Sequence, residues 1–325
     1  MSTVLEWFLV GLVLAVGAAV VAAACAALSW TAVGNTVRDI EPRRRFWLLS
    51  ALVVSPIVAI ALVLLFAFYP SALDVIGLVS MHCGAHCGHS FHLCFVHHSP
   101  PPVSAPILWL SVGLFAVVCA RWGVEVAAIT ASLRRARQLA QMARFDDERG
   151  IHVVESDRHV AMTVGLFRRR IVVSDRLEQY LSPQQFAAVI AHEQAHCRRF
   201  DGLIMLFLRM AAAFHLPGIR AELSRELRLA SEQCCDQAAA NDDRLTVAET
   251  ILAVERHHQQ LPALPGVERF GASDIEQRVQ GLLRDDWRRP NRVVIAVVAL
   301  TAAVVVFSNL HSLHHLTELA FAWLV

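Results

Sequence analysis

The chain has 325 residues, of which 56% are hydrophobic and 18% charged, with a formal net charge of +1 and a mean hydropathy of +0.48. The apolar content exceeds that of a typical soluble domain, and a net charge so close to zero excludes a general electrostatic attraction to nucleic acid. Long apolar runs fill the first third and the last tenth of the chain, so the composition predicts a membrane protein with one water-exposed domain.

Four apolar runs are long enough for a helix to cross a bilayer, which takes about 20 residues. They cover residues 5–33, 46–69, 106–133 and 293–310. Arginines cluster at one end of each run, whereas the loop 70–104 contains none. Because positive charge stays on the cytoplasmic side of a membrane, we expect both termini and the loop 70–104 outside and residues 134–292 in the cytoplasm.

This topology divides the chain into three parts. Residues 1–133 hold three transmembrane helices and the extracytoplasmic loop 70–104, residues 134–292 form a cytoplasmic domain, and residues 293–325 hold a fourth transmembrane helix and a short extracytoplasmic tail. Near the inner end of the third run, Arg121 and Glu125 stand four residues apart, so we expect them to form an ion pair.

The cytoplasmic part mixes strand-like and helical patterns. Short β-branched segments indicate strands at 151–156, 159–164 and 171–174. The 171–173 strand is a hypothetical edge along which a peptide substrate would pair. Ser182 followed by Pro183 marks the start of a helix. Further helices are expected at 201–215, which is too short to span and is interpreted as buried or membrane-skimming, and at 219–241. The segment 245–285 is also expected to be helical, broken at Pro262 and Pro265. These elements predict an α+β domain.

The clearest chemical motif lies on the helix that begins at Ser182. His192-Glu193-Gln194-Ala195-His196 matches the H-E-x-x-H pattern. Residues four apart face the same side of a helix, so His192 and His196 can bind one metal ion. Glu193 is placed to take a proton from a metal-bound water, whose pKa zinc lowers toward 7, and to pass that proton to the leaving amine.

A catalytic zinc site needs three protein ligands and one open position. Glu232 on the predicted helix 219–241 is the candidate third ligand, and Asp236 shares its helix face one turn later. We therefore predict that His192, His196 and Glu232 bind zinc, while Asp236 orients one imidazole through its second ring nitrogen. The alternative is a pair of solvated histidines, which the two carboxylates disfavour.

The chain resembles the BlaR/MecR-type family of membrane metallopeptidases within the gluzincin group. The resemblance covers about residues 160–285 and runs through 163–172, 181–201, 214–217 and 225–236, ending in the E-x-x-C-D pattern from Glu232 to Asp236. It implies a multi-pass α-helical membrane protein of four spans with a cytoplasmic α+β gluzincin-type metallopeptidase domain. It also implies zinc binding by His192, His196 and Glu232, with Glu193 catalytic.

The resemblance further implies a function in signalling across a bacterial inner membrane. An outside stimulus would license cleavage of a cytoplasmic protein, for which a winged-helix transcriptional repressor or the chain itself is the expected substrate. The best-known members carry a penicillin-binding sensor after the fourth span. This sequence has no S-x-x-K and no K-T-G motif there, so we do not expect β-lactam sensing.

The predicted outside loop is unusually rich in metal-ligating side chains. Residues 81–98 hold six of the sixteen histidines of the chain and three of its eight cysteines. Imidazole and thiolate suit zinc or copper, so we expect a second transition-metal or redox-sensing site, with a disulfide and uninvolved histidines as the alternative. The candidate residues of this accessory site are His82, Cys83, His86, Cys87, His89, His92 and Cys94.

Two other functions compete with the regulatory endopeptidase. An HtpX-type quality-control protease shares H-E-x-x-H, but that layout places full spans between the motif and the third ligand, and here only one short apolar helix intervenes. A non-catalytic metal-binding receptor would not need Glu193. Beyond membrane lipid and a protein substrate, we expect no direct nucleic-acid partner, and the sequence leaves a homodimer open.

Overall fold

The computed structural model describes residues 3–78, 93–96, 99–240, 243–260, 272–284, 286–287 and 316–320. Three long helices open the chain: α1 (Thr3–Arg38), α2 (Pro42–Val75) and α3 (Ala105–Met142). Each is long and apolar enough to cross a membrane. Three of the four predicted spans therefore coincide with helices, and the predicted fourth span at 293–310 lies outside the described residues.

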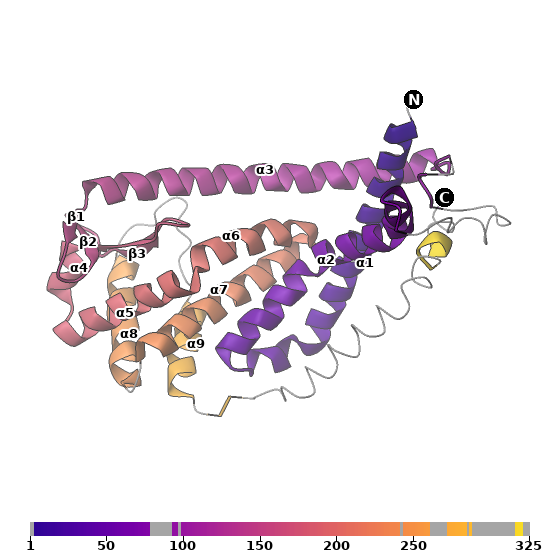
Figure 1. Cartoon of the computed structure of the whole chain (residues 1–325). Coiled ribbons are helices and arrows are strands. Elements are labelled where there is room, and N and C mark those ends of the chain that lie inside the picture. The colour runs from indigo at the N-terminus through magenta and orange to yellow at the C-terminus, as the bar shows by residue number, and fades with distance from the viewer. Residues whose placement is uncertain are drawn as a thin grey trace.

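A four-stranded mixed sheet follows α3 directly. Its strands are β1 (Arg144–Asp146), β2 (Ile151–Val154), β3 (Ala161–Val164) and β4 (Arg170–Ser174), in the spatial order β1-β2-β4-β3. The β2–β4 pair is parallel and the other two pairs are antiparallel. The predicted strands and the α+β class are confirmed, with helices packed beside the sheet (Figure 1).

The sheet order corrects the expected substrate edge. Residues 171–173 belong to β4, which has a neighbour on both sides and therefore cannot accept a further strand. Ile171, Val172 and Val173 are buried, as is typical of an interior strand. The open edge beside the H-E-x-x-H helix is β3 instead.

Seven helical elements complete the described domain. They are α4 (Asp175–Tyr180), α5 (Pro183–Arg199), α6 (Asp201–Ala211), the 3₁₀ turn η1 (Ala212–Phe214), α7 (Pro217–Ala240), α8 (Arg244–Gln260) and α9 (Ala272–Leu283). The predicted start of α5 is confirmed: the Ser182 hydroxyl accepts from Gln185 N, and the Gln185 side chain accepts from Ser182 N. This reciprocal pair satisfies two amide donors at the start of the helix.

The hairpin formed by α6, η1 and α7 packs directly on the membrane helices. A shared apolar core joins Trp30 of α1 and Phe46, Leu49 and Val53 of α2 to Leu208, Ala211, Ala212, Leu223, Leu227 and Ala230 of the hairpin. His215 at the hairpin turn is buried, with Nε2 3.0 Å from the Val53 carbonyl oxygen. Since α7 carries Glu232, the predicted third metal ligand sits on an element in contact with the membrane helices.

The expected ion pair between Arg121 and Glu125 is wrong. Arg121 donates to the carbonyl oxygens of Ala213 and His215, at 2.8 and 2.9 Å. Glu125 accepts instead from Arg209 of α6 and Arg220 of α7. The hairpin explains the difference, because a buried carboxylate pairs with the cations that tertiary packing brings to it rather than with its helical neighbour.

At the other end of α1 and α2, Leu93 before α3 is in contact with Glu318 near the C-terminus. Leu93 packs with Val10, Val13, Leu14 and Ala67, and its amide donates to Glu318 Oε1 at 2.8 Å. Of the predicted accessory metal residues, Cys94 is fully buried. His82, Cys83, His86, Cys87, His89 and His92 lie outside the described residues.

Candidate metal centre

The two histidines of the H-E-x-x-H motif converge on one point. His192 and His196 lie one turn apart on α5, and their Nε2 atoms are 3.1 Å from each other. Their rings are nearly perpendicular, with centroids 4.8 Å apart. Both Nε2 atoms therefore lie close enough together to share one ion.

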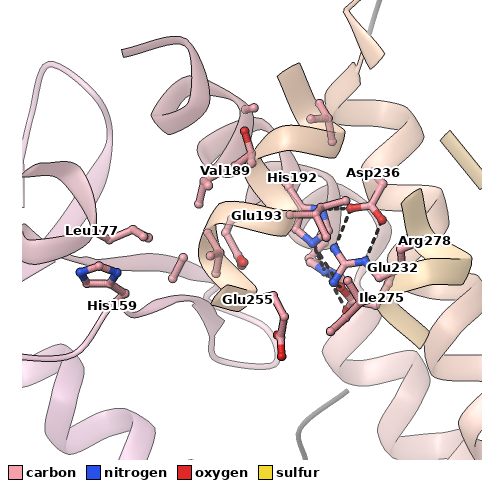
Figure 2. A pocket seen from close by; sticks show the side chains of 17 residues that line it. His159, Leu177, Val189, His192, Glu193, Glu232, Asp236, Glu255, Ile275 and Arg278 are labelled. Atoms are coloured by element: carbon pink, nitrogen blue, oxygen red, sulfur yellow. Dashed lines mark hydrogen bonds and ion pairs between the residues drawn. The ribbon is translucent and has the colours of Figure 1, made fainter. Parts of the chain in front are cut away.

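Glu232 of α7 reaches the same point from the facing helix. Its Oε2 lies 3.4 Å from His192 Nε2, and its Oε1 lies 3.5 Å from His196 Nε2. Ligand atoms around a tetrahedral zinc with bonds near 2.1 Å are about 3.4 Å apart. The donor set of two imidazoles and one carboxylate fits zinc in both chemistry and spacing, and the three predicted ligands are brought together (Figure 2).

Each imidazole is backed by a carboxylate on its other nitrogen. Asp236 Oδ1 lies 2.9 Å from His192 Nδ1, which is the arrangement that the sequence predicted for this aspartate. Asp201 Oδ2 lies 2.8 Å from His196 Nδ1. Such carboxylates fix the tautomer so that Nε2 is free to bind a metal, and they raise its basicity.

Sequence reasoning assigned no part to Asp201. Its position depends on Phe200, which adopts the left-handed conformation at φ 56° between α5 and α6. This turn brings Asp201 back against the last turn of α5, where Arg199 and the Ser231 hydroxyl also donate to it, at 3.0 and 2.9 Å. The sequence offered one indication of this role: Asp201 is an acidic residue that follows the basic C-terminal turn of the helix carrying the H-E-x-x-H motif.

A second missed residue, Arg278 of α9, joins the two carboxylates of α7. Its Nε and Nη2 donate to Asp236 at 2.8 and 2.7 Å, and its Nη1 lies 3.2 Å from Glu232 Oε2. Burial raises the pKa of both carboxyl groups, but the Arg278 charge and the histidine hydrogen bonds outweigh it and hold both pKa values low. Both carboxylates are thus kept ionised. No spacing rule links Arg278 to the motif, so the sequence carried no signal for it.

The same carboxylates set the charge of the imidazoles. Burial lowers the pKa of His192, but its hydrogen bonds to Asp236 and Glu232 raise it to about 9. The pKa of His196 is also raised, since its hydrogen bonds with Asp201, Cys235 and Glu232 exceed the effect of burial. A metal ion that binds here would displace protons from the imidazoles.

Cys235 lies beside this cluster without being a good ligand. Its sulfur is 3.4 Å from His196 Nδ1 and 3.5 Å from Asp201 Oδ2. Burial raises the pKa of the thiol to about 12, and only a thiolate binds metal well. We interpret Cys235 as a packing residue.

Glu193 lies between the ligands and the edge of the sheet. It is buried, and its Oε2 accepts a hydrogen bond of 2.8 Å from the Thr163 hydroxyl of β3. Cavities of about 290 and 280 Å³ meet at this carboxylate, and both are lined by Ala161 of β3 and by His196. The first extends past Val189 and Ile275 (Figure 2), and the second is also lined by Met162 and Arg169. Glu193 and β3 thus border both cavities.

We expect replacement of either backing aspartate by Asn to weaken zinc binding by about 10- to 100-fold, because the imidazole loses its anionic partner. The variants are D201N and D236N, and the measurement is competition for zinc against a fluorescent chelator. D243N, which alters an exposed aspartate before α8, is the matched control and should bind zinc as the parent chain does. Equal affinity of D201N and D243N would refute the assigned role of Asp201.

Comparison with known families identifies one match. The family described as BlaR1 peptidase M56 matches residues 106–282, which is more than half of the chain. The search of curated proteins found no match to this chain. The matched range runs from α3 to α9 and includes every residue of the metal centre described above.

Proposed function

The chain belongs to the BlaR1-type M56 family of peptidases, and from this premise we propose that it is a zinc endopeptidase, embedded in the bacterial inner membrane, that cleaves a cytoplasmic protein in response to an extracytoplasmic stimulus. One observation carries the proposal. Two imidazoles of α5 and one carboxylate of α7 converge within zinc-binding distance, and each imidazole is backed by an aspartate.

The residues present fit the chemistry of peptide-bond hydrolysis. His192, His196 and Glu232 would hold the ion, which when bound supplies a Lewis acid that lowers the pKa of water toward 7 and polarises a carbonyl. Glu193 takes a proton from the attacking water at a carboxylate oxygen and transfers it to the amine nitrogen of the leaving peptide. The Thr163 hydrogen bond holds the Glu193 carboxylate in one rotamer while this happens.

The position of β3 favours an endopeptidase. An extended substrate would add to the open edge of β3 through main-chain hydrogen bonds. Because Glu193 and β3 border two cavities, a substrate chain has room to continue beyond the bond that is cut. Arg169 lines the second cavity and would accept an acidic side chain there.

The topology supports a cytoplasmic site and a fourth span. Arg284, just after α9, bonds to Asp39 at the inner end of α1 at 3.1 Å, whereas Glu318 bonds to Leu93, which packs near the outer end of α1. Residues 284 and 318 thus lie at opposite ends of the spans. This supports a crossing at 293–310 with both chain termini outside and the peptidase domain in the cytoplasm.

The regulatory protease is favoured over an HtpX-type quality-control protease. Between His196 and Glu232 the described elements are α6, η1 and the first part of α7, and α6, with 11 residues, reaches only about 16 Å. That length cannot span a bilayer of about 30 Å. A non-catalytic metal receptor is disfavoured because Glu193 is buried and held beside the ligands.

The proposal is tested on the full chain, purified with zinc in detergent. Incubation with an unfolded protein such as casein should yield internal fragments by mass spectrometry, 1,10-phenanthroline should stop their formation, and added zinc should restore it. Release of single terminal residues would contradict the endopeptidase, and cleavage that survives removal of zinc would contradict the metal centre.

The regulatory part has its own test in bacterial membranes. Comparing proteins from cells that carry the chain or its E193Q variant should show one or a few cleaved substrates, a small winged-helix repressor or the chain itself among them. Many unrelated cleaved membrane proteins would favour quality control instead.

A further inference from the structure

A group of arginines stands at the turn of the α6–α7 hairpin, away from the metal centre. Arg209 of α6 and Arg220 and Arg228 of α7 line a cavity of about 300 Å³ together with Ser224, Ala221, Pro217 and Glu125. The residues from α7 recur at intervals of three or four, so they share one face of the helix. Small side chains of α7 also line the cavity.

Two of these arginines share one carboxylate. Among the described residues that line the cavity, Glu125 is the one acidic side chain, and it pairs with both Arg209 and Arg220. Arg209 donates to Glu125 Oε2 at 2.6 and 3.0 Å, and Arg220 donates to Oε1. The Arg209 and Arg220 side chains nevertheless stay 47% and 27% exposed. The cavity therefore presents partly accessible guanidinium donors, two of which share a single carboxylate.

The cavity lies near the inner boundary of the membrane. The apolar run of α2 starts at Phe46, after three arginines, and the hairpin turn at His215 contacts Val53, about 10 Å further along the helix. On α3, Trp122 donates to the Met210 carbonyl at 2.8 Å, beside Glu125. Tryptophan and arginine are both typical of the zone where headgroups meet acyl chains.

Apolar side chains next to the arginines are exposed. Phe207 is 52% exposed, Leu216 65% and Val124 69%, and they neighbour Arg209, Pro217 and Glu125 in sequence. Exposed apolar side chains on the same elements as a basic pocket match an amphipathic molecule with an anionic head. A guanidinium group can donate two parallel hydrogen bonds to phosphate oxygens, and the Ser224 hydroxyl is a further donor.

We propose that the pocket formed by Arg209, Arg220, Arg228 and Ser224 binds the phosphate of an anionic lipid headgroup in the cytoplasmic leaflet. Basic pockets between helices on this side of a membrane are suited to such headgroups. Arg228 precedes Glu232 by one helical turn, so a bound headgroup would also restrain the helix that carries the third metal ligand. The proposal depends on membrane insertion and not on peptidase activity, so each can fail without the other.

The test is native mass spectrometry of the full chain in detergent, with phosphatidylglycerol or phosphatidylcholine of identical acyl chains. The parent chain should retain phosphatidylglycerol at roughly tenfold lower lipid concentration than phosphatidylcholine. The variant E125Q/R209Q/R220Q should lose this preference, because it removes the charge-assisted donors. It also removes the carboxylate, so no buried charge is left without a partner.

R134Q/R137Q is the control, since it removes more net positive charge from exposed positions of α3. It should keep the preference for phosphatidylglycerol. Equal retention of both lipids by the parent chain, or an unchanged preference in E125Q/R209Q/R220Q, would overturn the proposal. Displacement of phosphatidylglycerol by millimolar inorganic phosphate would assign the pocket to a soluble phosphate and overturn the lipid site as well.

Discussion

Replacing Glu193 by Gln is expected to lower peptide-bond hydrolysis by about 100- to 10,000-fold while the chain keeps its zinc. The amide has nearly the same shape and can still accept from Thr163, which now holds Glu193 through a hydrogen bond of 2.8 Å. It cannot take a proton from water. Initial rates of cleavage and zinc content are to be measured on the same purified sample.

The matched control is E178Q, which makes the same change at an exposed glutamate of α4 paired with Arg149. It should cleave at the parent rate. If E193Q cleaves within a few-fold of E178Q, Glu193 is not the base, and another group must move the proton. If E193Q loses its zinc, the variant has disturbed the ligands and the loss of rate says nothing about proton transfer.

Replacing Glu232 by Ala is expected to remove both zinc and activity. Two imidazoles alone give two of the three protein ligands that a catalytic zinc site needs, and Arg278 would lose an anionic partner. Metal content after gel filtration should fall from one zinc per chain to nearly none. The measurement is inductively coupled plasma mass spectrometry, with circular dichroism to follow folding.

E222A is the control for this variant, because Glu222 lies on the same helix and pairs with Arg38 at a distance from the metal centre. It should retain one zinc and full activity. A zinc content of one in E232A, with normal folding, would remove Glu232 from the ligand set and leave the assignment of the site without its third member. Zinc lost from E222A as well would point to disturbed packing of α7 on the spans.

Local sequence patterns were sufficient to predict several helices and the pair of histidines. The helices over the three described apolar runs follow from their length and hydrophobicity, and α5 begins at Ser182 because its cap is built from neighbours in sequence. The pairing of His192 with His196 depends only on the pitch of one helix. Such features are predictable because every atom involved lies within a few residues of the next.

Glu232 and Asp236 form an intermediate case. Their spacing placed them on one face of α7, but that this face meets His192 and His196 depends on how α7 packs against α5. The chemistry of a zinc site limited the candidate residues, because it requires a third ligand and a carboxylate that orients an imidazole. The sequence could therefore identify Glu232 and Asp236 as candidates, but it could not show that they lie beside the two histidines.

Only the tertiary structure decided the remaining contacts. The left-handed turn at Phe200 brings Asp201 to His196, and the packing of α9 brings Arg278 to Asp236. The order of strands makes β3 rather than β4 the open edge. Each of these contacts forms between segments that the burial of apolar surface brings together. Because the hydrophobic effect is non-directional, the sequence pattern of one segment does not specify which other segment it meets. Periodicity in the sequence thus specified each element and its polar face, whereas packing chose which faces meet.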